Sequence, residues 1–152
     1  MLRRLRATRR SEWLKMRLEL TKRADYAIRT VLALARVPEG DRMSVRQVAA
    51  ERAVPERFLP QVMRDLVRAG LVVGTVGRTG GYRLAKPATE ISLLDVVEAV
   101  EGDSRRRACV LRGGPCVLDG VCDVHAVFAA AQDDVLHRLR RTTVAATVRT
   151  DL

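Results

Sequence analysis

The 152-residue sequence predicts a mainly α-helical fold with one small β-hairpin and a long carboxy-terminal helix. Apolar residues recur at helical spacing in several segments, and segment 71–85 changes to two short runs around a glycine-rich turn. The length suffices for one compact domain with appendages. The longest apolar runs are shorter than the roughly 18 residues that a membrane-spanning helix needs, so we expect no membrane partner.

The first helix is predicted to begin at Thr21, because apolar residues recur beyond it on one helix face. Pro38 and Gly40 end this pattern. Its apolar positions are Ala24, Ala27, Ile28, Val31, Leu32 and Ala35. Ser44 and Gln47 have the spacing of a capping box, in which each side chain satisfies a free backbone amide. They predict a brief second helix.

The third helix is predicted to begin at Pro55 and to end at Gly70, after a bend at Ala53 and Val54. Its apolar stripe is Phe58, Leu59, Val62, Met63, Leu66 and Val67. Pro60 lies beyond the first turn of a helix that begins at residue 55, where it removes a backbone hydrogen bond. We therefore expect a kinked or delayed start to this helix.

The predicted hairpin pairs segment 71–73 with segment 82–85 across the turn GTVGRTGG. Three helices followed by a hairpin is the order of a winged helix-turn-helix domain, in which the third helix enters the major groove of DNA. We expect this domain to span residues 16–90.

Two further segments complete the expected organisation. In segment 91–122, Ser92 and Asp95 predict a second capped helix that Gly102 ends, and a loop with three cysteines follows. In segment 123–152, a long helix runs to about residue 141 and a tail follows. One side of that helix is apolar, and it carries Val124, Val127, Phe128, Ala131, Val135 and Leu139.

The charge indicates a polyanionic partner. Lysine and arginine number 28 against 18 acidic residues, which gives a net charge of +10 at pH 7. Residues 1–15 hold half of this charge, with five arginines and one lysine against one glutamate. They form either a basic, disordered extension or a segment upstream of the true start at Met16. Five aromatic residues are too few to stack single-stranded bases, so duplex DNA is the expected partner.

Polar residues of the predicted third helix and wing are the candidates for DNA contact. Arginine and glutamine can read base edges, whereas lysines suit phosphates, and glycines in the wing allow close approach of the backbone. The candidates are Lys22, Arg46, Glu56, Arg57, Gln61, Arg64, Arg78, Gly80, Gly81 and Lys86. The alternative is an ordinary solvated helix face. The net charge and the adjacent hairpin favour DNA contact.

The three cysteines predict a metal centre. Cys109, Cys116 and Cys122 follow the pattern C-x6-C-x5-C, and His125 lies three residues after the last one. Thiolates bind zinc and iron-sulfur clusters, and the intervening glycines allow the loop to curl. The wide spacing suits an iron-sulfur cluster better than zinc, which prefers closer pairs. Zinc and inert reduced thiols are the alternatives. The odd cysteine count argues against a disulfide framework and favours a cytoplasmic setting.

Several segments together carry a resemblance that covers residues 16–149. They are MRLELTKRADYAIRTVLALA from Met16, GRTGGYRLAKP from Gly77, ISLLDVVEAVEG from Ile91, the three spaced cysteines and TTVAATV near the end. These segments resemble the Rrf2 family of bacterial winged-helix regulators, which includes iron-sulfur assembly regulators and nitric-oxide sensors. The chain departs from the family pattern in one extra residue in MRLELT, in the six residues between the first two cysteines, in Pro60 and in the amino-terminal extension.

The resemblance implies a homodimer that forms through the apolar face of the last helix and binds a palindromic operator. It also implies that Cys109, Cys116 and Cys122 hold an iron-sulfur cluster, either 4Fe-4S or 2Fe-2S, together with a fourth ligand. Asp25, in the motif ADYAIR, matches the position used toward the partner subunit's cluster in the nitric-oxide sensors. His125 matches the position used in the assembly regulators. The two cues point to different branches of the family.

The function that the sequence predicts is a dimeric DNA-binding transcriptional repressor. Its operator affinity is controlled by an iron-sulfur cluster that senses nitric oxide, redox state or iron-sulfur status. A regulator with a zinc site or a thiol redox switch is the alternative, and an iron-sulfur electron-transfer subunit is a less favoured one. We expect neither an enzyme nor a small-molecule substrate, because the sequence shows no paired carboxylates or activated nucleophile of the kind that catalysis needs. Asp133 and Asp134 do not make such a pair, since they are adjacent on a helix and point apart.

Overall fold

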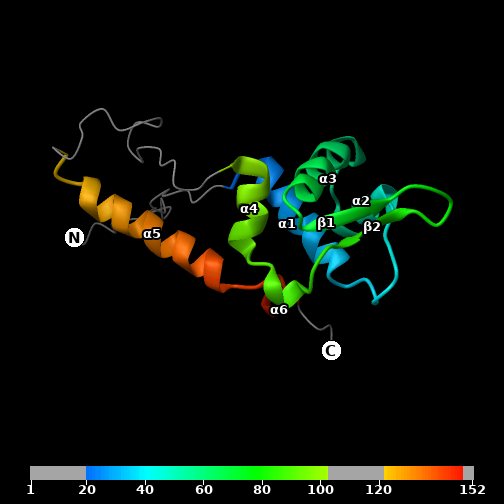
Figure 1. Ribbon diagram of the computed structural model, residues 1–152. Coiled ribbons are helices and arrows are strands. Elements are labelled where there is room, and N and C mark those ends of the chain that lie inside the picture. The colour runs from blue at the N-terminus through cyan, green and yellow to red at the C-terminus, as the bar shows by residue number, and fades with distance from the viewer. Residues whose placement is uncertain (1–19, 103–121, 149–152) are drawn as a thin grey trace, which may run out of the picture.

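A computed structural model describes residues 20–102 and 122–148 of the chain (Figure 1). Its helices are α1 (Lys22–Leu34), α2 (Val45–Arg52), α3 (Leu59–Arg68), α4 (Leu93–Glu101), α5 (His125–Arg141) and α6 (Val144–Thr147), with 3-10 turns at Glu56–Phe58 and Ala88–Glu90. Its strands are β1 (Val72–Thr75) and β2 (Gly81–Leu84). The predicted fold class, mainly helical with one hairpin, is confirmed.

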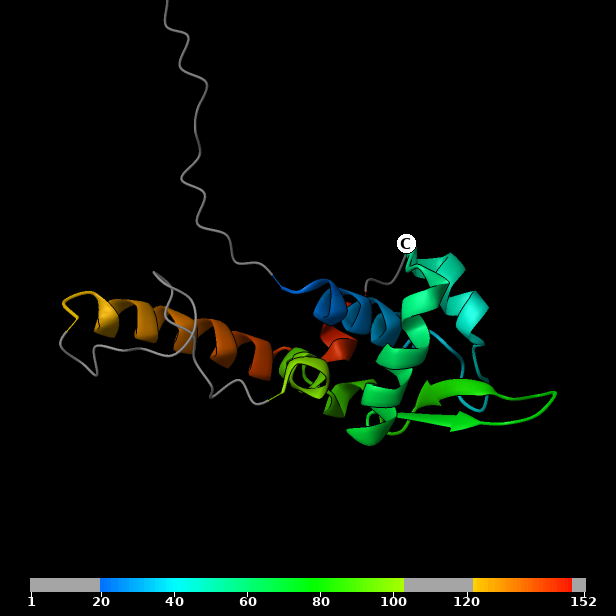
Figure 2. The same ribbon diagram turned by 90° about the horizontal axis from the view of Figure 1, so that it is seen from above.

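Helices α1 to α4 pack around one core, and together with the hairpin they form a unit that we call the head. Helix α1 contacts α2, α3, α4 and β2. The largest side chains that the head buries completely are Leu59, Met63, Leu66, Ile91 and Leu94. Figures 1 and 2 show α5 projecting from the head at the end opposite the tip of the hairpin.

The hairpin is antiparallel, with Val72 opposite Leu84 and Thr75 opposite Gly81. Met43 extends the pairing, because its N–H donates to the Tyr82 carbonyl at 2.9 Å and its carbonyl accepts from the Tyr82 N–H at 2.8 Å. This bridge connects the segment before α2 to β2 of the hairpin, which we call the wing. The observed strands begin and end within one to two residues of the predicted ones.

Both predicted capping boxes are present. The Ser44 hydroxyl accepts from the Gln47 N–H at 3.3 Å, and the Gln47 side chain accepts from the Ser44 N–H at 2.8 Å. Ser92 and Asp95 make the same pair of bonds at the start of α4, at 3.0 and 2.8 Å. Each box satisfies two backbone donors that the helix cannot satisfy itself, which fixes where α2 and α4 begin.

The start of α3 confirms the effect expected of Pro60. A 3-10 turn precedes the helix, and the regular α-helix begins at Leu59. Pro60 therefore occupies the first turn, where its missing N–H breaks no helical bond. The prediction that Phe58 and Val67 belong to the buried stripe is wrong, since they are 40% and 42% exposed. The 3-10 turn rotates Phe58 off the stripe, and Val67 lies near the helix end.

Helix α6 was not expected, and it anchors the far end of α5 to the head. Val144 is buried, and its N–H donates to the Ile91 carbonyl at 2.8 Å. The Leu93 N–H donates to the Thr142 carbonyl at 2.9 Å. These bonds set the position from which α5 projects. Within residues 20–102 and 122–148, no helix is long and apolar enough to span a membrane.

Candidate nucleic-acid interface

The turn between α2 and α3 sets the direction of α3. Ala53 adopts the left-handed conformation, with φ 51° and ψ 41°, and ends α2. The Val54 N–H donates to the Ala49 carbonyl at 3.2 Å, and Val54 is buried. Pro55 then continues in an extended conformation. A tight turn of this kind, between a short helix and a second helix with an exposed polar side, is the geometry of a helix-turn-helix.

The polar residues of α3 and of the turn before it are exposed, as a groove-reading helix requires. Glu56, Arg57, Gln61 and Arg64 all face solvent, whereas Val62 is buried beneath them. Arg64 forms no hydrogen bond or ion pair with any described residue. Arg57 lies 4.8 Å from the centre of the Phe58 ring, which holds its guanidinium by a cation-π contact.

Two of the predicted DNA contacts pair with each other. The Arg46 Nε and the Glu56 Oε1 lie 3.7 Å apart, and the two side chains are 87% and 57% exposed. An ion pair this exposed contributes little to stability, so a phosphate can displace it at small cost. The contact brings the start of α2 close to the start of α3.

A buried carboxylate, which sequence reasoning missed, lies at the middle of α3. Asp65 is completely buried, and its carboxylate accepts from Arg23 of α1 and from Arg68 Nη2 at 2.6 Å. Gln61 Nε2 donates to it at 3.4 Å. Burial by itself raises the pKa of Asp65, but the hydrogen bonds and charges of these partners outweigh it and hold the pKa below its ordinary value.

The tip of the wing is exposed. Val76 and Arg78 face solvent, and Val76 is fully exposed. Contacts within the chain require glycine at positions 80 and 81, independently of their predicted DNA contact. A Cβ on Gly80 would lie 2.3 Å from the Thr75 carbonyl oxygen, and one on Gly81 would lie 2.8 Å from the Met43 carbonyl oxygen. Gly81 also has a φ of 143°. Gly80 does not have a positive φ.

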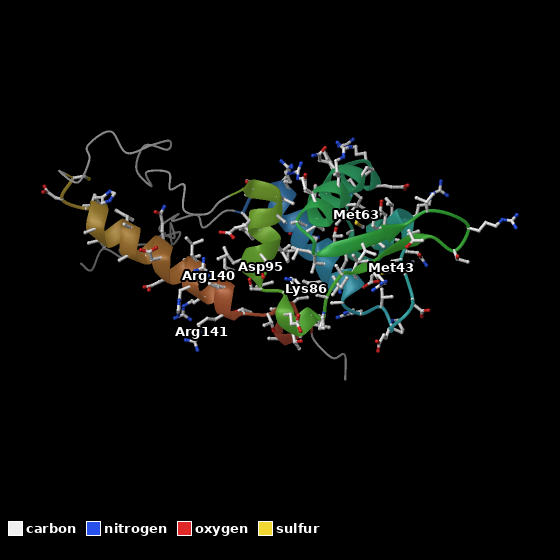
Figure 3. The ribbon with its side chains drawn as sticks, in the orientation of Figure 1. Met43, Met63, Lys86, Asp95, Arg140 and Arg141 are labelled. Atoms are coloured by element: carbon white, nitrogen blue, oxygen red, sulfur yellow. The ribbon has the colours of Figure 1, made fainter. Side chains whose placement is uncertain are left out.

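The two predicted phosphate-binding lysines lie on different parts of the head. Lys22 is the first residue of α1 and is exposed. Lys86 follows β2, and Figure 3 shows it on the side of the head away from α3. The structure therefore groups the α3 and α2 candidates closely and leaves Lys86 outside that group.

One of the three predicted cysteine ligands is described. Cys122 has a free thiol directly before α5, and its carbonyl accepts from the His125 N–H at 3.0 Å. Cys109 and Cys116 lie outside the described residues. Among residues 20–102 and 122–148, no group of three or more histidine, cysteine or acidic side chains lies close enough to hold a metal.

The two candidate fourth ligands lie in different places. His125 is in the same turn as Cys122. Asp25 lies on α1, and in Figures 1 and 2 that helix is far from the start of α5 in the same chain. The Asp25 carboxylate pairs with Arg29 Nε at 2.8 Å. Arg29 Nη1 also donates to the carbonyl of Arg52, the last residue of α2, at 3.3 Å.

The apolar face predicted on α5 is covered only in part in the single chain. None of the 17 residues of this helix is buried, and Val127 is 69% exposed. Val124 is 39% exposed, and Ala131 is also exposed, whereas Phe128, Val135 and Leu139 are partly covered. An apolar stripe left open on a projecting helix is typical of a protein–protein contact.

The turn between α2 and α3, the exposed polar side of α3 and the bridged hairpin together define a winged helix-turn-helix DNA-binding protein. The sequence model of the Rrf2 family, described as an iron-dependent transcriptional regulator, matches residues 20–150. The chain belongs to the Rrf2 family, and it is a transcriptional regulator rather than an enzyme.

Three known proteins illustrate the relationship. The transcriptional regulator NsrR of Shouchella clausii is 34% identical over 128 residues, which cover 84% of this chain and 86% of NsrR. Protein aau3 of Rhizobium meliloti is 34% identical over 129 residues, covering 84% of this chain and 82% of that protein. The structure of CymR (YrzC), the global cysteine regulator of B. subtilis, superimposes with a TM-score of 0.75 at 23% identity. It covers 89% of this chain and 100% of CymR, and at that identity it shows the shared fold.

Proposed function

We propose that this regulator is a homodimeric repressor whose affinity for a palindromic operator is set by an iron-sulfur cluster. The observation that carries the proposal is the position of Cys122. Its free thiol lies just before α5, at the end of the cysteine segment, by which we mean residues 103–122, and this segment begins after the end of α4. Helix α4 contacts both α1 and α3. The segment that carries the proposed ligands therefore connects α5 to α4, and α4 packs on the DNA-reading helix α3.

The donor set fits an iron-sulfur cluster. Three thiols lie within fourteen residues, and the described one is neither in a disulfide nor fully buried. Cys109, Cys116 and Cys122 would hold the cluster, with Asp25 from the partner subunit or His125 as the fourth ligand. A bound cluster would supply a centre that reacts with nitric oxide and with oxidants. The chain's own part is to hold three thiolates together in one loop, which orders the connection between α4 and α5.

The contacts of Asp25 favour it as the ligand that would transmit a signal. Because Asp25 accepts from Arg29, any new partner of this carboxylate competes with Arg29 for it. Arg29 also holds the last carbonyl of α2, directly before the left-handed Ala53. A change at Asp25 is therefore two contacts away from the turn that directs α3. These two contacts connect Asp25 to the turn before α3, and we propose that a signal passes along them.

The open apolar face of α5 supports the proposed dimer. A twofold dimer places the same face of each chain in one contact. Two heads held in this way can present their α3 helices to successive major grooves, about 34–36 Å apart. Exposed arginines on α3 and Arg78 at the wing tip would then contact each half-site. The proposed partners are thus duplex DNA and a second copy of the chain.

The ligand assignment is tested by anaerobic purification followed by iron and sulfide analysis and a visible spectrum. We expect coloured wild-type protein and colourless Cys116→Ala and Cys122→Ala variants. Asp25→Asn and His125→Ala decide the fourth ligand, because the variant that loses or shifts the visible absorbance identifies it. Asp41→Asn is the matched control for the loss of an exposed carboxylate. Bound zinc, or colourless wild-type protein whose DNA binding responds to thiol oxidants, would contradict the iron-sulfur assignment.

The dimer is tested by the substitution Val127→Asp, which places a charge on the open face of α5. We expect sedimentation analysis to show dimers for the wild type and monomers for this variant, because burying an unpaired carboxylate is costly. Ala126→Asp is the matched control on the opposite side of the same turn, and it should remain dimeric. Monomeric wild-type protein would overturn the proposed interface.

A further inference from the structure

Asp65 is the one acidic side chain in the described part of the chain that is completely buried. A buried carboxylate is expensive unless it is paired and hydrogen-bonded. Here three donors surround it: Arg23 from α1, Arg68 one turn later in α3, and Gln61 one turn earlier. Both arginines keep exposed surface, at 43% and 71% of their side chains. The cluster therefore carries one negative charge inside and two positive charges at the surface.

We propose that Asp65 is a positioning residue that fixes the side-chain amide of Gln61 in the orientation that reads adenine. The inference rests on the proposed DNA contact of α3, and it deepens that function by naming the base that one residue recognises. Gln61 is exposed on the polar side of α3, and its Nε2 donates to the buried Asp65 Oδ2.

The chemistry of the carboxylate determines the orientation of the amide. An ionised carboxylate accepts hydrogen bonds and cannot donate them, so it selects the nitrogen end of the Gln61 amide. One of the two Nε2 hydrogens is then engaged by Asp65. The other hydrogen and the oxygen Oε1 remain for a partner outside the helix. Glutamine reads adenine with this same pair of groups, one acceptor for N6 and one donor for N7.

The two arginines keep Asp65 ionised and screen its charge from DNA. Arg68 Nη2 lies 2.6 Å from Asp65 Oδ1, while Arg23 and Gln61 bond to Oδ2. Because both carboxylate oxygens have a cationic partner, the carboxylate remains charged at neutral pH and does not repel a nearby phosphate. Arg23 also binds α1 to the middle of α3, so that the helix and its reading side chain are fixed together.

Arg64 is the natural comparison on the same helix. It lies three residues after Gln61, is exposed, and has no hydrogen-bond or ion-pair partner among the described residues. An arginine without such restraint can adapt to phosphate or guanine. Gln61 loses less conformational freedom on binding, because Asp65 already holds its amide. Helix α3 thus carries one polar side chain that is held in place, Gln61, and one that is not, Arg64.

The experiment selects binding sites from a pool of randomised duplex DNA with the full-length, anaerobically purified protein. The selected duplex and an unrelated duplex of equal length are then titrated with the wild type and the variants Gln61→Met, Asp65→Asn and the double variant. Arg64→Met is the matched control. We expect the wild type to prefer adenine at one position in each half-site. Gln61→Met and Asp65→Asn should each reduce this preference over the other bases by about tenfold. The double variant should lose no more than Gln61→Met alone.

The affinity for unrelated DNA separates positioning from stability. Asp65→Asn removes a negative charge, so its non-specific affinity should stay equal or rise, whereas a merely structural role would weaken binding to all sequences together. An adenine preference that survives Gln61→Met overturns the proposal even if Asp65→Asn fails to fold. Loss of the adenine preference in Arg64→Met alone would also overturn the proposal. A wild type that selects no sequence would contradict the proposed operator function itself.

Discussion

The head and α5 differ in how each is stabilised, although one short chain forms both. In the head, α1, α3 and α4 bury whole faces, and both α2 and α4 begin in reciprocal capping boxes. Helix α5 is the longest helix in the described part of the chain, and it buries no residue. The head therefore has a buried core of its own, whereas much of the apolar face of α5 is open in the single chain. We assign stability and DNA reading to the first region, and we propose that the second serves assembly and sensing.

The two regions meet at a small number of defined contacts. Backbone bonds from Leu93 to Thr142 and from Val144 to Ile91 fix the end of α5 next to the start of α4. The other end of α5 begins at His125, three residues after Cys122, and the chain between Glu101 and His125 connects it to α4. A group bound by that segment would therefore change how α5 is held and would leave the core of the head unchanged.

The largest expected effect comes from matched leucine substitutions in the two regions. Leu66→Ala should reduce the free energy of unfolding by about 2–5 kcal/mol, because Leu66 is fully buried and its removal leaves a cavity. Leu139→Ala should instead leave the head nearly as stable and weaken self-association. Thermal unfolding at several protein concentrations measures both. Equal, concentration-independent losses in the two variants would remove the distinction between the regions.

A smaller effect is expected from the Asp65 cluster, and it depends on pH. The pKa of Asp65 is lowered in the folded chain, so its contribution is complete above the unfolded value of about 3.9 and is lost as the pH falls through the folded value. Asp65→Asn should cost about 1–3 kcal/mol at pH 7. The difference between wild type and variant should shrink below about pH 4. Denaturant titrations at pH 7 and pH 3 provide the test, and a difference that grows toward acid would refute the assigned cause.

Next in size is the loss of a helix cap in the head. Ser92→Ala should reduce the free energy of unfolding by about 1 kcal/mol, because Asp95 N–H loses its acceptor. Thr142→Ala is a suitable comparison, since its hydroxyl donates to a carbonyl at the exposed end of α5. That substitution should change stability by less. A larger loss at Thr142 than at Ser92 would show that the end of α5 carries more stability than its exposure indicates.

The smallest effect is expected in the turn before α3. Ala53→Gly should raise the free energy of unfolding by about 0.5 kcal/mol, because glycine adopts the left-handed conformation more readily than alanine. Ala49→Gly, in the interior of α2, should lower it by a similar or larger amount. A loss of stability in Ala53→Gly would mean that the entropy of the unfolded chain outweighs the conformational relief.

Most of the fold could be predicted because its determinants are local in the sequence. Gly70 and Gly102 mark the ends of α3 and α4, and the two capping boxes mark where α2 and α4 begin. The delayed start of α3 followed from the chemistry of Pro60 alone. Helix α6 could not be predicted, because its burial depends on a contact between Val144 and segment 91–93.

The site was less predictable, because its geometry depends on residues distant in sequence. Asp65 looked like one more polar residue of a charged helix, and its principal partner, Arg23, lies 42 positions away. A useful signal was present, since Asp65 falls between the apolar Val62 and Leu66 on the buried stripe. Periodicity placed Phe58 in the core, whereas the 3-10 turn leaves it exposed beside Tyr26, with ring centres 5.4 Å apart.

The central claim is that the state of the cysteine segment controls DNA binding by the head. The direct measurement is the affinity of anaerobically purified protein for its selected duplex before and after exposure to nitric oxide, alongside Cys122→Ala. Nitric oxide should weaken specific binding by at least about tenfold, or 1.4 kcal/mol. Cys122→Ala should bind weakly before exposure and should not respond to it. Equal affinity in all three samples, with iron and sulfide present in the wild type, would contradict the claim.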